Sequence, residues 1–390
     1  MRRTIAVVTT SRADYSHLYW PLKELLAHPA ADLKLIVIAS HLSPEFGSTV
    51  REIEKDGFPI AARLECLLSS DSDVGMAKSI GVAVLSLADC LAAMRPDVLL
   101  LIADRYEMLA PAAVALALRI PIAHIEGGEI SRGAIDDAVR NALTKMSHIH
   151  FTSTTGARER VISMGEEPWR VHRAGAPSLD HLRKSKLLSR AELEETLQID
   201  LTPPSAIVAY HPVTLLTDTN AEAEELFAAL TQIPHQLIFC HPNADAGGQD
   251  LSQRIRSFLA ERRSGYLFVN LSVIQYWSLL QHADLLVGNS SSGIMESASF
   301  GLPTVNIGMR QQGRERARNV LDAEPLAASI LQQLHKADTE SFRASLAGMT
   351  NPYGDGGAAE RIVHVLTTLP SRDRLLLKLD PDCVSGASPS

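Results

Sequence analysis

The chain has 390 residues, 46% of them hydrophobic and 21% charged, which is typical of a globular protein with two or more domains. Its formal net charge is −8 and it has no block of basic residues, so neither a nucleic acid nor an anionic membrane is expected as a partner. The four cysteines are widely scattered without a CxxC pair, which indicates reduced thiols in a cytoplasmic protein.

The first half of the chain alternates short apolar runs with amphipathic stretches. The runs predicted to be strands are Ile5–Val8, Leu33–Ala39, Val98–Ile102, Ile120–Ile125 and Ile149–Thr152. The stretches predicted to be helices are Leu18–Leu26, Met76–Met94, Pro111–Leu118 and Ala134–Met146. Continuous apolar strands separated by helices indicate a parallel sheet buried on both faces. The first run is too short for a signal peptide, and none is expected to span a membrane.

The second half repeats this pattern after a polar stretch, Lys184–Pro204. Its predicted strands are Ala206–Tyr210, Gln236–Cys240, Tyr266–Val269, Ala283–Val287 and Thr304–Ile307. We therefore expect two Rossmann-like, doubly wound domains that face each other across a cleft. They comprise residues 1–180 and 181–380, and residues 381–390 are expected to form a flexible tail.

Charged and polar side chains follow many of the predicted strands. Ligands of doubly wound sheets bind beyond the carboxyl ends of the strands, so these side chains are the candidates for a ligand site. The set comprises Arg12, Asp14, Asp104, Arg105, Glu126, His211, His241, Asn243 and Glu296, with Asp136, Asp137 and Arg140 early in the helix after Glu126. A single such aspartate is usually a helix cap, and a single histidine is usually a buried, hydrogen-bonded side chain. Convergence of at least three carboxylates and two histidines on one cleft instead favours acid–base chemistry or a cationic centre.

A serine-rich segment, GNSSSGIMESASFGLP, occupies residues 288–303. It follows a predicted strand, and the stretch from Ile294 to Phe300 is predicted to be a helix that ends at Gly301–Pro303. Free N–H groups at a helix N-terminus, together with small hydroxyl groups, favour an anion, most often phosphate. A serine-rich cap without a ligand is the alternative at this point.

Several other kinds of site lack their motifs. No HExxH, HxH or paired DxD spacing occurs at these strand ends, which disfavours a metal site. No GxGxxG follows the first strand, where TSRADYS supplies a guanidinium group instead, and no GxxxxGK[ST] is present. The serines are not accompanied by a GxSxG elbow, so they are expected to bind rather than to act as nucleophiles.

Taken in order, the motifs resemble those of the hydrolysing UDP-N-acetylglucosamine 2-epimerases of sialic-acid and related nonulosonate biosynthesis. The resemblance rests on TSRADYS, DRYEMLA, HIEGGE, GAIDDAVRNALTKMSHIHFTST, GAPSLD, HPVT, HPNADAGG, GNSSSGIMESASFG, PTVNIGMRQQGRE and NPYGDGGAAERI, which cover nearly the whole chain. It implies a glycosyltransferase-B architecture, a UDP-sugar substrate, a cytoplasmic homodimer or homotetramer, and neither metal nor NAD as a cofactor.

The resemblance also implies a role for each site residue. Ser290 and Ser291 would contact the diphosphate, with Glu296 on the ribose. The remaining substrate-binding residues would be Arg12, Arg105, His241, Asn243 and Arg310. The acid–base group would comprise Asp104, Glu126, Asp136 and His211. Two positions depart from the family pattern, because Ala103 stands where the family usually has glycine and Asn141 where it usually has histidine.

The implied reaction starts with elimination of UDP. Loss of UDP places positive charge at C1, which makes the C2 proton removable by a carboxylate, and water then adds to the resulting glycal. The products would be UDP and a free N-acetylmannosamine-type sugar. Three other possibilities remain: a non-hydrolysing epimerase, a glycosyltransferase of the same architecture, and a catalytically silent nucleotide-sugar-binding protein. The sequence does not choose between UDP-N-acetylglucosamine and a UDP-2,4-diacetamido-6-deoxy sugar.

Overall fold

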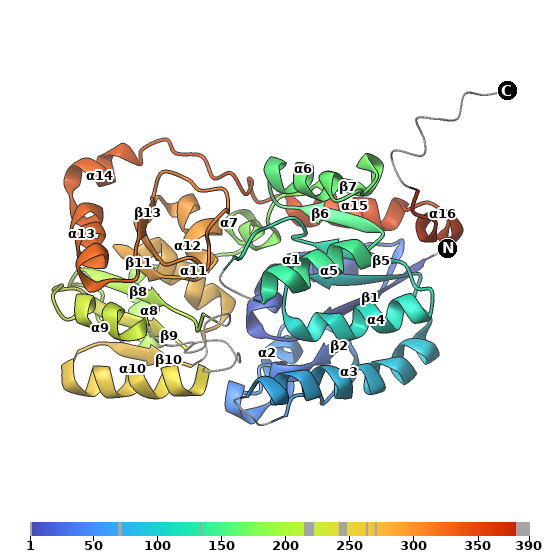
Figure 1. Ribbon diagram of the computed structural model, residues 1–390, viewed down its shortest axis with the longest axis horizontal. Helices are drawn as coiled ribbons and strands as arrows, with labels where there is room; N and C mark the ends of the chain where they lie inside the picture. The colour runs from blue at the N-terminus through green and yellow to red at the C-terminus, as the bar shows by residue number, and fades with distance from the viewer. Residues whose placement is uncertain are drawn as a thin grey trace.

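The structure, a computed structural model, describes residues 2–68, 72–132, 135–213, 222–241, 248–262, 264–269 and 271–379. These residues form two parallel sheets flanked by helices (Figure 1). The first sheet has seven strands in the order β3-β2-β1-β4-β5-β6-β7, and the second has six in the order β10-β9-β8-β11-β12-β13. In the first sheet the strand order reverses between β1 and β4, and in the second it reverses between β8 and β11. This reversal confirms the prediction of two doubly wound, Rossmann-like sheets.

The first sheet follows the predicted apolar runs closely. Its strands are β1 (Arg3–Thr9), β2 (Ala31–Ile38), β3 (Ile60–Leu64), β4 (Val98–Ile102), β5 (Ile122–Ile125), β6 (Ile149–Thr152) and β7 (Val171–Arg173). Its main helices are α1 (Arg12–Ala27), α2 (Val50–Lys55), α3 (Asp73–Met94), α4 (Leu109–Ala117), α5 (Asp136–Met146) and α6 (Thr155–Ser163).

The second sheet begins after α7 (His181–Lys184) and α8 (Arg190–Leu197). Its strands are β8 (Ser205–Ala209), β9 (Gln236–Cys240), β10 (Tyr266–Phe268), β11 (Leu285–Gly288), β12 (Thr304–Ile307) and β13 (Val320–Ala323). Its helices are α9 (Ala223–Leu230), α10 (Gly248–Arg262), α11 (Val273–His282), α12 (Ser292–Met295), α13 (Ala327–Asp338) and α14 (Glu340–Ser345). The polar stretch between the halves therefore contains a helix, α8, and is not simply a linker.

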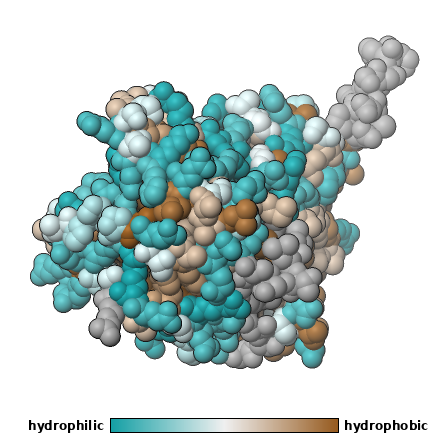
Figure 2. Space-filling view, turned by 60° about the vertical axis from the view of Figure 1, so that its left-hand side comes forward, coloured by the Kyte–Doolittle hydropathy of each residue, from teal (hydrophilic) through white to brown (hydrophobic). Residues whose placement is uncertain are grey.

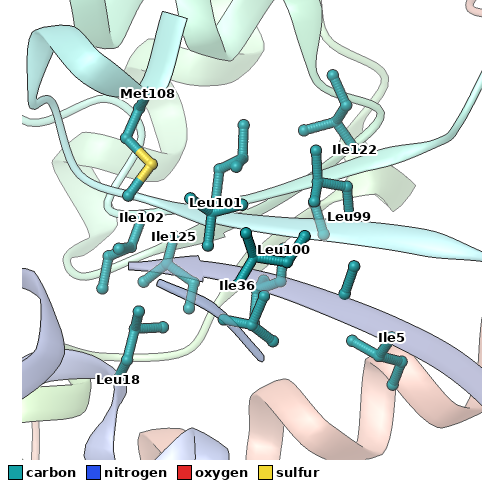
Figure 3. Packing of buried hydrophobic residues seen from close by; sticks show 14 of the residues in the cluster. Ile5, Leu18, Ile36, Leu99, Leu100, Leu101, Ile102, Met108, Ile122 and Ile125 are labelled. Carbon is teal, nitrogen blue, oxygen red and sulfur yellow. The ribbon is translucent and has the colours of Figure 1, made fainter. Parts of the chain in front are cut away.

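Continuous burial explains why the central strands could be predicted. Every residue of β4 is buried, because helices cover both faces of the sheet. Figure 3 shows the β4 side chains Leu99 and Leu101 packed among apolar residues of neighbouring elements, including Leu18 from α1. Edge strands are less regular in burial: β3 alternates half-buried and exposed residues, and its strand character was not predicted.

The last helices return to the first sheet. Helix α15 (Ala358–Thr368) packs against α1, and its Ile362 and Leu366 join the same hydrophobic cluster as β1 and β4 (Figure 1). The following helix, α16 (Arg372–Leu376), is held by Arg170, whose guanidinium donates to three of the carbonyls of residues 374–377. The boundary between residues 180 and 181 stays a prediction, and the tail from residue 381 lies outside the described residues.

Helix α3 corrects one expectation from the sequence. By length and composition alone it could cross a membrane, whereas no run was expected to reach that length. In the structure α3 packs on α4, and its Ala83, Leu87 and Leu91 belong to the core of the first domain. Core helices of soluble proteins pass the same length test.

Figure 2 shows the surface of the molecule, turned about the vertical axis from the view of Figure 1. This face is mostly hydrophilic, with hydrophobic side chains gathered near its middle.

Candidate active site

A pocket opens at the carboxyl ends of β8, β9 and β11 and is closed on its other side by α1. Six of the predicted site residues line this pocket: Arg12, His211, His241, Ser290, Ser291 and Glu296. Other lining residues include Ser16, His17, Tyr276 and Ser292. The pocket therefore draws on both sheets, as expected for a ligand site at the strand ends of facing domains.

The serine-rich turn has a more compact geometry than the sequence predicted. After β11 the chain makes one short α-helical turn, α12, and then a 3₁₀ turn at Ser297–Phe300, rather than one continuous helix. Gly288 adopts φ +142°, and a Cβ at this position would lie 2.1 Å from the carbonyl oxygen of Ala209. Glycine is therefore required for the turn to pass so close to β8.

Asn289 fastens this turn to His211. Its Oδ1 accepts from the backbone N–H of His211 at 2.8 Å, and its Nδ2 donates to the His211 carbonyl at 2.9 Å. The backbone carbonyl of Asn289 in turn accepts from Arg310 Nη1 at 3.1 Å and from Gln311 Nε2 at 2.9 Å. The serine turn, His211 and Arg310 are thus held as one unit.

Arginines give this side of the site a positive potential. Arg12 Nη1 donates across the domain boundary to the carbonyl of Val269 at 2.9 Å. Arg105 is oriented by Glu107, to which it donates at 2.9 and 3.1 Å. Burial, and then the charges of Arg310, Arg105 and Arg12, hold the pKa of His211 well below its ordinary value. His211 is therefore neutral, and the arginines around it suit a diphosphate.

Carboxylates from the two domains meet at His17. Its Nδ1 lies 2.6 Å from Glu126 Oε1, and its Nε2 lies 3.6 Å from Glu296 Oε1. Ser178 Oγ also donates to Glu296 Oε1, at 2.5 Å. Burial raises the pKa of Glu296, as does the nearby charge of Glu126, while His17 and Ser178 oppose this rise.

Asp104 is held between two arginines rather than by the pocket itself. Arg140 of α5 donates to Asp104 and, at 2.9 Å, to Ser131 Oγ. Arg314, from the second domain, donates to the same Ser131 Oγ at 3.1 Å and lies 4.0 Å from Asp104 Oδ2. Burial pushes the pKa of Asp104 upward, but Arg140 and Arg314 bring it below its ordinary value. Asp104 is therefore an ionised carboxylate with little tendency to take up a proton near neutral pH.

The backbone is strained at Glu126 and at the residue before Asp104. Ala103, directly before Asp104, has φ +57°, and Glu126 itself has φ +66°. The left-handed region costs a residue with a Cβ about 1–2 kcal/mol, and such strain is concentrated at functional sites. Ala103 occupies the position at which the resembling family usually has glycine, so this chain keeps the conformation without the residue that adopts it most easily.

Other predicted site residues have structural roles or stay open. Asp14 caps α1 by accepting from the N–H groups of Thr10 and Ser11 at 2.8 and 3.0 Å, so the helix-cap interpretation holds for it. Asp137 accepts from the N–H of Ser131 at 2.8 Å. Asp136 is the first residue of α5 and is half-buried. Asn243 lies outside the described residues, so its predicted contact with the nucleotide sugar stays a prediction.

Three residues near the site were not predicted from the sequence. His17 lies one helical turn after Ala13, so the periodicity of the helix that begins at Arg12 could have placed it in the pocket. Glu129 is buried, and Tyr353 donates to its Oε2 at 3.4 Å. Arg314 reaches the first domain from the loop after β12, a contact that no feature of the sequence indicates. Among the described residues, no three His, Cys, Asp or Glu side chains converge as a metal-binding group.

Comparison with known proteins gives consistent matches along the chain. The profile of a family described as UDP-N-acetylglucosamine 2-epimerase matches residues 23–367. The chain is 35% identical to the GDP/UDP-N,N′-diacetylbacillosamine 2-epimerase (hydrolyzing) of Campylobacter jejuni over 345 residues, which cover 88% of this chain and 89% of that protein. It is 35% identical to the UDP-N,N′-diacetylbacillosamine 2-epimerase (hydrolyzing) of Legionella pneumophila over 379 residues, 97% and 99% of the two chains.

Among solved structures, the UDP-GlcNAc 2-epimerase from Neisseria meningitidis bound to UDP-GlcNAc is similar in fold. Its TM-score is 0.78 at 18% sequence identity, over 94% of this chain and 100% of that chain. The two doubly wound sheets with the site between them therefore have the glycosyltransferase-B architecture.

Proposed function

Because this chain belongs to the UDP-N-acetylglucosamine 2-epimerase family, we propose that it is a hydrolysing 2-epimerase of a UDP-linked 2-acetamido sugar. The observation that carries this proposal is that a part suited to binding UDP and a part suited to chemistry on the sugar lie side by side in one interdomain site. A pocket lined by Arg12 and the serine turn, with the charges of Arg310 and Arg105 acting on its His211, suits UDP. Glu126, which has a strained backbone, and Asp104, which follows the strained Ala103, suit chemistry on the sugar.

The reaction proceeds by elimination followed by hydration. The C1–O bond breaks with its electron pair leaving on UDP, and a carboxylate removes the proton from C2, so that a C1=C2 double bond forms. Water then supplies a hydroxyl group to C1 while a proton adds to the opposite face of C2. The net change consumes one water and releases UDP and the free 2-epimeric sugar.

Each part of the site has a role in this reaction. Arg12 and the serine turn, which line the pocket, stabilise the negative charge that grows on the departing diphosphate, and Arg310, hydrogen-bonded to the Asn289 carbonyl of that turn, adds its positive charge. Neutral His211 sits among these arginines and is suited to hydrogen bonding rather than to charge. Glu126 is the carboxylate best placed to move a proton, because arginines hold Asp104 ionised. Asp104 then stabilises the positive charge that develops at C1.

We propose UDP-N,N′-diacetylbacillosamine as the preferred substrate. Support comes from the names of the relatives in Campylobacter jejuni and Legionella pneumophila, each 35% identical to this chain over most of its length. UDP-N-acetylglucosamine is the second candidate, because a Neisseria meningitidis protein named UDP-N-acetylglucosamine 2-epimerase is 29% identical over 337 residues.

A substrate panel with product identification by NMR tests both parts of the proposal. The purified chain is incubated with each UDP-sugar, and UDP and free sugar are quantified. We expect UDP and a free 2-epimeric sugar in equal amounts, with the highest kcat/KM on the diacetamido sugar. An epimeric UDP-sugar would indicate a non-hydrolysing epimerase. Turnover only with an added acceptor would indicate a glycosyltransferase, and binding without turnover would leave a nucleotide-sugar-binding protein.

We also propose that the protein is a cytoplasmic homodimer or homotetramer in nonulosonate biosynthesis. The outer face of α3 and α4 supports self-association, because Leu85, Val74 and Leu116 are exposed there, Leu85 to 73%. Replacing Leu85 by glutamate should shift the mass measured by light scattering from that of the oligomer toward 42.3 kDa, the mass of one chain. A wild-type mass already at that value would reject the oligomer.

A further inference from the structure

His17 is the one described side chain that the structure shows between a carboxylate of the acid–base group and a carboxylate assigned to UDP. Glu126 follows β5 in the first domain, and Glu296 follows α12 in the second. His17 approaches Glu126 through Nδ1 at 2.6 Å and Glu296 through Nε2 at 3.6 Å. A carboxylate accepts hydrogen bonds, so a ring with a carboxylate near each nitrogen is best satisfied when both nitrogens carry protons.

We propose that His17 is a positioning residue that stays positively charged between Glu126 and Glu296, fixes the Glu126 carboxylate for proton transfer at C2, and keeps the two carboxylates of the closed site compatible. This inference rests on the proposed function and deepens it. The chemistry itself remains with Glu126, which His17 orients.

The distances assign different tasks to the two ring nitrogens. The contact with Glu126 has hydrogen-bond length, whereas 3.6 Å to Glu296 is too long for one. Glu296 can therefore engage the ribose hydroxyls without breaking a hydrogen bond to His17. The hydrogen bond to Glu126 persists at the same time, so the acid–base carboxylate stays in place when the nucleotide binds.

The backbone at Glu126 explains why its side chain needs a partner. With φ +66°, Glu126 holds a conformation that residues with a Cβ rarely adopt, which sets the direction in which its side chain starts. The imidazole of His17 then fixes where the carboxylate ends. Without a cation, Glu126 and Glu296 would be two buried carboxylates facing one another, which is unfavourable for both in the charged state.

The charges around His17 favour its protonated form. Burial lowers the pKa of His17, but Glu126, Glu296 and Asp14 together raise it to about 9. His181 of α7, which also interacts with His17, has a pKa lowered to about 4, chiefly by burial and also by the charge of His17, so it is neutral. The remaining titratable groups around the same pocket are Arg12, His211, His241, Cys240 and Tyr276.

Substitution can separate the charge of His17 from its shape. His17→Gln keeps a hydrogen-bond donor but removes the charge, His17→Lys keeps a charge, and His28→Gln at the end of the same helix is the matched control. For His17→Gln we expect kcat to fall roughly tenfold or more with a smaller change in KM.

Lysine at position 17 should restore part of kcat. The wild type should lose activity as His17 loses its proton near pH 9, and His17→Lys should carry that limb toward the higher pKa of lysine, about 10.4. The proposal is overturned if folded His17→Gln keeps the wild-type kcat and pH profile. It is also overturned if His17→Lys, folded by its thermal melt, is no better than His17→Gln.

A measurement on the wild type keeps the proposal testable even if the variants do not fold. Nitrogen-15 NMR of the histidine rings follows the protonation of all 14 histidines as the pH is raised. We expect one ring to remain doubly protonated above pH 8, and its absence would overturn the proposal. This readout does not need turnover, so it also separates failure at His17 from failure of the proposed epimerase, which the product assay reports by itself.

Discussion

The carbonyl oxygen of Ala103 accepts a hydrogen bond from Nε2 of His124 at 2.8 Å, and it does so from a backbone with φ +57°. Burial lowers the pKa of His124 to about 4, so the ring is neutral and Nε2 carries its single proton. A neighbouring strand thus holds the strained residue that precedes Asp104. The conformation typical of glycine is kept here by tertiary contacts around an alanine.

Ala103→Gly should therefore not lower the free energy of unfolding, and it should raise it by up to about 1 kcal/mol. The reason is that glycine adopts the left-handed region without the Cβ penalty. Urea denaturation measures the difference. The control is Ala77→Gly on the exposed face of α3, which should lose about 1 kcal/mol from helix propensity alone. If both variants lose the same free energy, the strain at Ala103 is not energetically significant.

Glu126→Gln should reduce turnover by roughly 10²–10⁴-fold, because the amide keeps the size of the side chain but cannot move a proton. Calorimetry should show nearly unchanged UDP affinity, since the pocket is lined by Arg12 and the serine turn rather than by Glu126. In deuterated water the wild type should place one deuterium at C2 of the released sugar. Retention of the original hydrogen would instead point to simple hydrolysis of the UDP-sugar.

The serine turn should contribute to UDP affinity through hydrogen bonds to a charged ligand, each worth about 1.5–3 kcal/mol. Ser290→Ala with Ser291→Ala should therefore weaken UDP binding by tenfold or more in calorimetry. Ser163→Ala, at the exposed end of α6, is the control and should bind UDP normally. Unchanged affinity in the double variant would return the turn to a serine-rich cap without a ligand.

Removal of metal ions should leave turnover unchanged, because charge stabilisation on UDP comes from the arginines of the chain itself. Activity is measured before and after dialysis against a chelator, with and without added magnesium or manganese. Loss of turnover that only an added ion restores would contradict the expectation of a metal-independent site.

Glu166 makes stability dependent on acidic pH. It is buried and accepts from Lys145 at 2.7 Å, His150 at 3.1 Å and Lys378 at 2.7 Å. Burial raises its pKa, but these three donors lower it to about 2, below the ordinary value of 4.5. The ionised Glu166 therefore stabilises the fold fully above about pH 4.5, and this contribution disappears as the pH falls toward 2.

Comparison with Glu166→Gln tests this dependence. Wild type should be the more stable protein at neutral pH, and the two free energies of unfolding should converge as the pH falls below about 4.5. Glu159→Gln, on the exposed face of α6, should follow the wild type throughout. A constant gap between wild type and Glu166→Gln at every pH would contradict the assignment.

The central strands and the strand-end position of the site could be predicted from the sequence. The runs predicted for β4, β6, β9 and β12 match the observed bounds. Such strands are buried on both faces, so each appears in the sequence as a continuous apolar run. This run can be recognised without knowing which strands or helices pack against it. The half-buried edge strands β3, β7 and β13 carry no such run, and they were not predicted.

Residue type at a strand end did not determine residue role. Asp14 and Asp104 both follow a central strand, yet Asp14 caps a helix while Asp104 lies between two arginines. A cap is satisfied by backbone groups within a few residues, whereas Arg140 and Arg314 come from a later helix and from the other domain. Only the assembled fold brings such partners within reach.

The sequence by itself determined the two doubly wound sheets, the arginine and serine ligands expected for a diphosphate, and the carboxylates at the edges of the cleft. Tertiary structure decided which carboxylates are free to react. His17 meets Glu126 across 109 residues of chain, and Arg314 reaches Ser131 across 183. The local order of apolar and polar residues indicates which strands are buried and where helices form, because both depend on residues close together in the sequence. Pairing of charges depends on how two domains close on one another, and no short stretch of sequence contains that geometry.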